Sequence, residues 1–148
     1  MRERALLLLA LFGVAMAHVE GVAVVYLRKA LGMIDSESNR ESVEKLPRRY
    51  LHIERSREAA TIVMLAAVAC LTGGGWLERG IFFLWTFAFW DLFYYLSLYI
   101  LIRWPPTLKT ADVLFLIPAP WIAPVWVPVG ISSLTIIAIA LLYLLRMI

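Results

Sequence analysis

The chain has 148 residues, of which 62% are hydrophobic and 17% are charged, and its mean hydropathy is +0.80. A soluble domain is nearer half apolar and a quarter charged, so this composition excludes a water-soluble domain and indicates lipid as the solvent. The formal net charge of +3 does not indicate a nucleic-acid partner, because the basic residues gather in loops beside apolar segments. We therefore expect an all-α integral membrane protein, a single domain over 1–148 built as a four-helix transmembrane bundle.

The first apolar segment runs over about 5–27, which is long enough for one helical crossing of a membrane. Its beginning has the features of a cleavable signal peptide, but the apolar residues continue for a full crossing, which favours a retained helix. Gly13, Ala17 and Gly21 repeat at four-residue spacing, a pattern that allows two helices to approach closely. We expect this face to pack against a neighbouring helix.

Glu20 is an acidic residue inside this first segment. On a helical wheel it lies within about 60° of Gly13 and Ala17, and it is about 11 Å inside the end of the segment at 1.5 Å per residue. His18 points roughly to the opposite side, so the two side chains cannot hold one ion on a regular helix. We expect Glu20 to face protein.

The segment over 28–57 contains most of the basic residues of the chain, together with several acidic residues. Basic loops are retained in the cytoplasm, so we expect this loop to be cytoplasmic and both termini to lie outside. In a bacterium, the membrane would be the cytoplasmic membrane.

The second helix is expected over about 58–77, and a charged stretch precedes it. Glu54, Glu58 and Thr61 share one helical face, whereas Arg55 and His52 lie on a neighbouring face. Acidic residues in a first turn also complement the helix dipole. Stabilisation of the helix dipole is the better interpretation of Glu54. For Glu58, this interpretation and a role in a functional site are equally favoured.

The third helix is expected over about 80–102, with Asp91 near its middle. A carboxylate at this depth costs roughly 2.5–3.5 kcal/mol on insertion scales, so Asp91 must face protein or water. Tyr94 and Tyr95 lie about one turn away and are suitable hydrogen-bond donors. We predict that Asp91 meets Glu20 across a helix–helix contact and that these two tyrosines complete the hydrogen bonds.

The last apolar segment contains four prolines, at 118, 120, 124 and 128, and is too long for one straight crossing. We expect a short helix over 111–117, a proline-broken segment, and a final helix over about 120–146. A re-entrant hairpin followed by a short fifth helix is the alternative.

These polar residues predict a cytoplasm-facing intramembrane acidic site in an enzyme or a binding protein. Buried carboxylates are competent proton donors or acceptors, and an apolar surround suits a lipid-like or isoprenoid ligand. The candidate catalytic residues are Glu20, Asp91 and Glu58. The candidate substrate-binding residues are Arg55, His52, Tyr94 and Tyr95.

A di-metal centre is an alternative, because the chain offers carboxylates and imidazoles of the kinds that di-iron bundles use. The Glu-x-x-His pairs of those bundles do not occur in this sequence, which disfavours it. The candidate metal ligands are Glu20, Glu54, Glu58, Asp91 and His52.

Two other functions fit the same pattern. Buried acids also mark proton or cation pathways, and a chain with four helices would then need to form an oligomer. Alternatively, the protein is an accessory subunit of a larger membrane complex, in which Glu20 and Asp91 pair with a partner's groups. Membrane lipid is an expected partner in every case, with a homo-oligomer or a larger complex as further possibilities.

Overall fold

The computed structural model describes residues 2–30 and 48–145, which form four helices and one pair of strands. The middle of the expected cytoplasmic loop, 31–47, and residues 146–148, which include the expected end of the last helix at 146, lie outside the described residues. The elements are α1 (Arg2–Ala30), α3 (Arg48–Thr72), α4 (Trp76–Ile102), β1 (Ala111–Phe115), β2 (Trp121–Pro124) and α5 (Trp126–Leu144).

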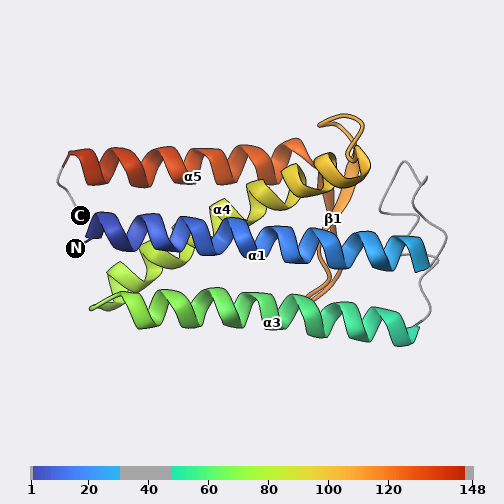
Figure 1. Ribbon diagram of the computed structural model, residues 1–148, viewed down its shortest axis with the longest axis horizontal. Coiled ribbons are helices and arrows are strands. Elements are labelled where there is room, and N and C mark those ends of the chain that lie inside the picture. The colour runs from blue at the N-terminus through green and yellow to red at the C-terminus, as the bar shows by residue number, and fades with distance from the viewer. Residues whose placement is uncertain (1, 31–47, 146–148) are drawn as a thin grey trace.

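The helices lie lengthwise beside one another, and α4 crosses α1 obliquely (Figure 1). The N- and C-termini and the turn from α3 to α4 lie at one end of the bundle, which we call the terminal end. The strands β1 and β2, the last turns of α1 and the first turns of α3 lie at the opposite end, the hairpin end (Figure 1).

Three helices of the described chain are long and apolar enough to cross a membrane: α1 from Glu3, α4 and α5. The chain is therefore mostly helical and compatible with an integral membrane location. Helix α3 is not among these three, because Arg55, Arg57 and Glu58 occupy its first half. Its apolar part covers only 59–72, about 21 Å at 1.5 Å per residue, against the roughly 30 Å of a hydrocarbon core.

The second helix ends at Thr72 and not near residue 77 as expected, because three glycines follow it and Trp76 already begins α4. A Cβ at Gly73 would lie 2.8 Å from the backbone nitrogen of Arg79, so the turn is too tight for a side chain there. The Arg79 Nε donates to the Gly73 carbonyl at 3.0 Å, and Glu78 accepts from the Gly74 N–H at 2.8 Å.

The prediction of an all-α chain with a short helix over 111–117 is wrong. Residues Ala111–Phe115 form a strand that pairs antiparallel with Trp121–Pro124. A proline cannot continue a helix, so Pro118 and Pro120 disfavour one here, and Ala123 of β2 is pushed toward an extended conformation because Pro124 follows it. The last helix begins at Trp126 and not near residue 120, because residues 121–124 belong to β2.

The predicted small-residue face of α1 packs against α4, which confirms that expectation. A Cβ at Gly13 would lie 2.7 Å from the Thr86 carbonyl oxygen of α4, and a Cβ at Gly21 would lie 3.1 Å from the Ser97 Cβ. Ala17, between the two glycines, is completely buried. A larger side chain at these positions would push the two helices apart.

Candidate functional site

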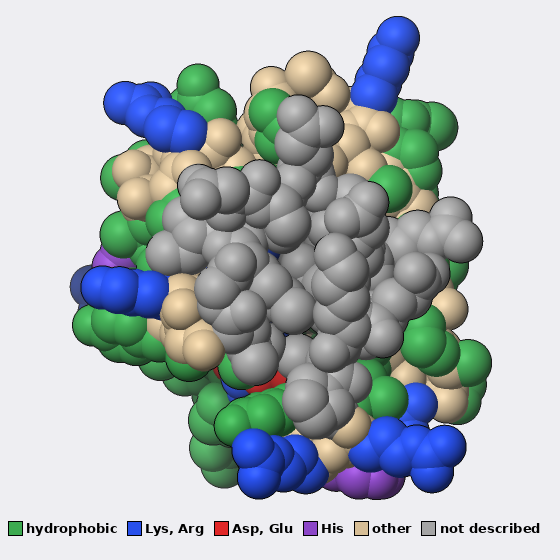
Figure 2. Space-filling model, turned by 90° about the vertical axis from the view of Figure 1, so that its right-hand side faces the viewer, with side chains coloured by type: hydrophobic (Ala, Val, Ile, Leu, Met, Phe, Trp, Pro, Cys, Tyr) green, Lys and Arg blue, Asp and Glu red, His purple; other side chains and the backbone are tan. Residues whose placement is uncertain are grey.

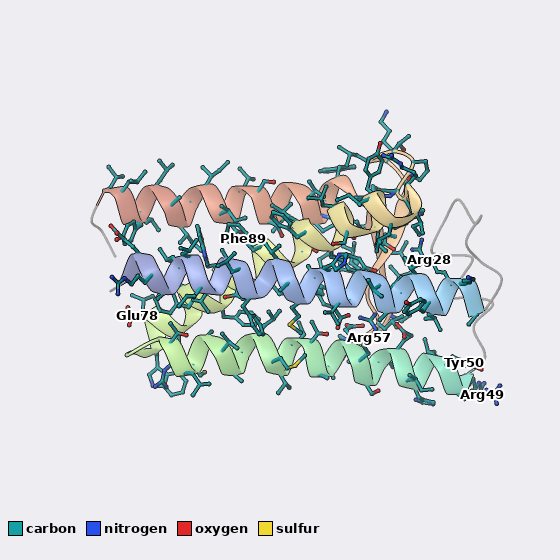
Figure 3. The ribbon with its side chains drawn as sticks, in the orientation of Figure 1. Arg28, Arg49, Tyr50, Arg57, Glu78 and Phe89 are labelled. Carbon is teal, nitrogen blue, oxygen red and sulfur yellow. The ribbon has the colours of Figure 1, made fainter. Side chains whose placement is uncertain are left out.

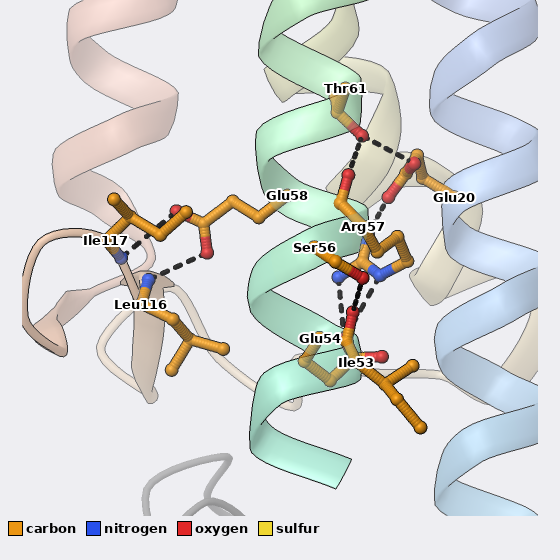
Figure 4. A network of polar contacts seen from close by, with 9 residues as sticks. All are labelled: Glu20, Ile53, Glu54, Ser56, Arg57, Glu58, Thr61, Leu116 and Ile117. Carbon is orange, nitrogen blue, oxygen red and sulfur yellow. Dashed lines mark hydrogen bonds and ion pairs between the residues drawn. The ribbon is translucent and has the colours of Figure 1, made fainter. Parts of the chain in front are cut away.

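Glu20 of α1 is bonded to two side chains of α3, close to the hairpin end (Figure 4). The Thr61 hydroxyl donates to Glu20 Oε1 at 2.7 Å, and Arg57 forms an ion pair with the same carboxylate. Arg57 also pairs with Glu54 at 2.9 Å. These contacts join α1 to α3, because positions 54, 57 and 61 fall on one face of a helix.

Arg57 therefore serves two carboxylates at once. Burial raises the pKa of the Glu54 carboxyl above its ordinary value, and the negative charge of Glu58 raises that pKa further.

Glu58 points away from Glu20, toward the strand pair on the other side of α3 (Figure 4). Its carboxylate accepts hydrogen bonds from the backbone N–H groups of Leu116 at 2.8 Å and Ile117 at 3.4 Å. These residues directly follow β1 and lead into the turn of the hairpin. Glu58 thus anchors the hairpin to α3, and its role as a catalytic residue stays a prediction.

The predicted contact between Asp91 and Glu20 is wrong. Asp91 is buried and accepts a hydrogen bond from the Ser132 hydroxyl of α5 at 2.7 Å, whereas Glu20 is bonded to α3. The physical reason is that α4 packs against both α1 and α5, and Asp91 lies on the side of α4 that faces Ser132 of α5. The three proposed catalytic residues therefore have different partners. Glu20 bonds to α3, Glu58 bonds to the hairpin backbone, and Asp91 bonds to α5.

Asp112 at the start of β1 is a buried acid that the sequence patterns did not identify as part of a site. It is 2% exposed, it accepts a hydrogen bond from the Tyr95 hydroxyl at 2.8 Å, and it accepts another from the Val113 N–H at 2.8 Å. The sequence does place Asp112 directly before an apolar segment, which could have indicated a buried acid. An acidic residue in that position is equally typical of the first turn of a helix, so the pattern did not distinguish the two.

Arg28, near the end of α1, is a second residue that the sequence patterns treated as a loop charge. It is 3% exposed, and its guanidinium carbon lies 4.2 Å from the ring centroid of Trp104. The Trp104 ring is stacked on Tyr95 with the centroids 6.3 Å apart. Within the described residues, Nε and Nη2 of Arg28 and Nε1 of Trp104 are buried and have no hydrogen-bond partner.

Tyr94 lies between these groups, because it packs against the core cluster that contains Tyr95 and Trp104 and also against the cluster that contains Ala17 and Leu65. Its ring meets Tyr95 edge-on, with the centroids 5.4 Å apart. We use the name polar layer for the residues that α1, α3, α4 and β1, together with the segment after α4, contribute here: Glu20, Arg28, Glu54, Arg57, Thr61, Tyr94, Tyr95, Trp104 and Asp112.

The other residues proposed from the sequence lie near the surface. His52 is exposed, and Arg55 is half-buried with an Nε that has no partner in the described part of the chain. His18 is exposed, and its Nδ1 lies 3.4 Å from the Ser97 hydroxyl.

Over residues 2–30 and 48–145, no group of three or more His, Cys, Asp and Glu side chains is arranged to hold a metal ion. The candidate ligands Glu20 and Glu58 instead bond to Thr61 and to the hairpin backbone. The residues present therefore do not fit a di-metal centre.

Comparisons with protein-family models, with curated proteins and with solved structures found no match to this chain. The functional argument therefore rests on the chemistry of the polar layer.

Proposed function

We propose that the protein is an integral membrane protein that binds a lipid-like ligand, with an acyl or isoprenoid chain, at the polar layer. The observation that carries the proposal is an imbalance of hydrogen-bonding groups. Glu20 bonds to Thr61 and forms an ion pair with Arg57, and Asp112 bonds to Tyr95, whereas buried N–H groups of Arg28 and Trp104 have no acceptor among the described residues.

A buried donor without an acceptor costs about 1–3 kcal/mol, and more when the group is charged. The oxygen atoms of a ligand would supply the missing acceptors, and its chain would lie against the apolar helices. Irregular backbone such as the hairpin, at the edge of a membrane protein, is also where a polar group can enter without crossing the hydrocarbon core.

The proposal includes an orientation in which the hairpin end faces the cytoplasm. Lys and Arg side chains stand around the edge of that end (Figure 2). Exposed basic residues there include Lys29, Arg48, Arg49, Arg103 and Lys109. Basic residues are retained on the cytoplasmic side, so both termini would lie outside.

Two alternatives receive less support from the described contacts. An accessory subunit would offer its buried acids to a partner, but Glu20 and Asp91 already bond within the chain, to Thr61 and Ser132. A proton or cation pathway would need acids that can change partners, and the same internal bonds hold both carboxylates in place.

The test is to purify the protein in a mild detergent and to identify bound molecules by native mass spectrometry. We expect a lipid retained on the chain after delipidation, and we expect its addition to raise the melting temperature, because a ligand that binds only the folded state stabilises it. Recovery of the chain without any retained lipid, and without a melting shift across a series of acyl and isoprenoid lipids, would contradict the proposal. Co-purification as a fixed part of a larger complex would favour the accessory-subunit alternative.

A further inference from the structure

The side chain of Arg28 lies at the hairpin end of the bundle (Figure 3). Trp104 lies beneath its guanidinium, 4.2 Å from the ring centroid to the guanidinium carbon, and Trp104 is itself stacked on Tyr95. All three belong to a buried part of the chain, with Trp104 4% and Tyr95 6% exposed. The stack leaves the edge of the guanidinium as the part that can bind something else.

That edge still has donors to offer. Asp112 is joined to this stack through Tyr95, because its carboxylate accepts from the Tyr95 hydroxyl at 2.8 Å, and it also accepts from the Val113 N–H. Nε and Nη2 of Arg28 have no partner in the described chain, and neither has the indole N–H of Trp104.

A guanidinium presents its N–H groups as a rigid fork that matches two oxygens of a phosphate or a carboxylate, and charge-assisted hydrogen bonds are the strong ones. Because the stack on Trp104 already fixes the fork, little further ordering is needed when an anion binds. The exposed Lys29 and Arg103 at the same end would attract anionic lipids from the cytoplasmic leaflet.

From these contacts we propose that Arg28 and Trp104 form an anionic head-group subsite for a lipid, with Nε and Nη2 of Arg28 and Nε1 of Trp104 as its donors. This inference rests on the proposed function above and names the chemical class of the head group. The atoms that Arg28 and Trp104 would bind are phosphate or carboxylate oxygens, and we propose that a membrane lipid supplies them.

The experiment measures the binding of two lipids with identical acyl chains, anionic phosphatidylglycerol and zwitterionic phosphatidylcholine, to the purified full chain by native mass spectrometry and thermal shift. We compare the parent with Arg28→Gln, Arg28→Lys and Trp104→Phe, and use Lys109→Gln as the control that removes an exposed charge from the same end. Inorganic phosphate is a separate arm.

We expect the parent to prefer phosphatidylglycerol, and we expect Arg28→Gln to weaken its binding about tenfold or more, because hydrogen bonds to a charged group are lost. Arg28→Lys should restore part of the preference, because it keeps the charge without the fork. Trp104→Phe keeps the ring under the guanidinium and should lose a smaller part, whereas Lys109→Gln should behave as the parent.

Trp104→Phe and Arg28→Lys keep the test valid if Arg28→Gln does not fold. Unchanged preference for phosphatidylglycerol in Arg28→Lys and Trp104→Phe would overturn the subsite and leave the proposed function standing. A parent that binds neither lipid would overturn the subsite, and the proposed function would fall with it only if no lipid of the acyl and isoprenoid series bound either. Equal protection of the parent by inorganic phosphate at the same concentration would show that the occupant is not a lipid, and would overturn the inference.

Discussion

At the scale of single residues, the polar side chains in the apolar interior act as connections between elements. Thr61 and Arg57 connect α3 to Glu20 of α1, and Ser132 connects α5 to Asp91 of α4. A charged group placed among apolar helices must find such partners, because its transfer from water is costly. The identity of each partner depends on which helix lies opposite, and no local sequence pattern specifies that.

Thr61→Val tests the connection between α1 and α3. Valine has nearly the shape of threonine but cannot donate to Glu20, so we expect a loss of about 1 kcal/mol in the free energy of unfolding, the usual size for a hydrogen bond between membrane helices. The measurement is a thermal or denaturant unfolding series in detergent.

Thr135→Val is the matched control, because the Thr135 hydroxyl only donates to the carbonyl of Ile131 in its own helix, at 2.8 Å. We expect this control to unfold like the parent. Equal losses in the two variants would mean that the bond from Thr61 to Glu20 contributes nothing of its own.

At the scale of elements, the contact between α1 and α4 is set by the small residues of α1. The backbones approach so closely at Gly13 that a Cβ there would meet Thr86, Phe89 and Trp90 of α4 at 2.7–3.2 Å. Spacing alone predicts this contact, because small residues at every fourth position form a continuous groove on any regular helix.

Gly13→Ala should therefore destabilise the fold by about 1–3 kcal/mol through overpacking, since the nearest obstacle is a backbone carbonyl that cannot move aside. The unfolding free energy of the purified protein checks this. Gly80→Ala is the control, because nothing lies within 4 Å of a Cβ at Gly80 and alanine is the better helix former. If Gly13→Ala were as stable as Gly80→Ala, the close approach of α1 and α4 would be refuted.

The hairpin is the element that the sequence analysis predicted wrongly. The residues of β1 are compatible with a short helix, and the competing signal was the series of prolines that follows. The strand is held by its pairing with β2 and by the hydrogen bonds of Glu58 to Leu116 and Ile117. Both depend on residues distant in the chain, and local propensity does not report them.

At the scale of the whole molecule, the two ends of the bundle differ in chemistry. The terminal end carries the short turn at Gly73–Gly75 (Figure 1), whereas the hairpin end carries the polar layer and, around its edge, exposed basic residues (Figure 2). The apolar part of α3 is about 21 Å long, shorter than a crossing, so its charged first half lies beside the last turns of α1. This mismatch is what brings Arg57 to Glu20.

Cysteine labelling tests the orientation of these ends. In a Cys70→Ala background, we expect a membrane-impermeant maleimide added outside intact cells to label Gly74→Cys at the terminal end and not Lys109→Cys at the hairpin end. Both positions are exposed. Permeabilised cells provide the control, in which both positions should react. Labelling of Lys109→Cys from outside would reverse the proposed orientation and place the polar layer on the outer side.

The sequence by itself determined that three helices are long and apolar enough to cross a membrane, the approximate positions of α1, α4 and α5, and the face of α1 that meets another helix. Composition, segment length and residue spacing are local properties, and each has a direct physical consequence in lipid. Only the tertiary structure decided that Asp91 bonds to Ser132 and not to Glu20, that Glu58 holds a hairpin, and that Arg28 and Asp112 are buried. These features arise where elements cross, and the oblique angle of α4 and the pairing of β1 with β2 are set by packing across the whole chain.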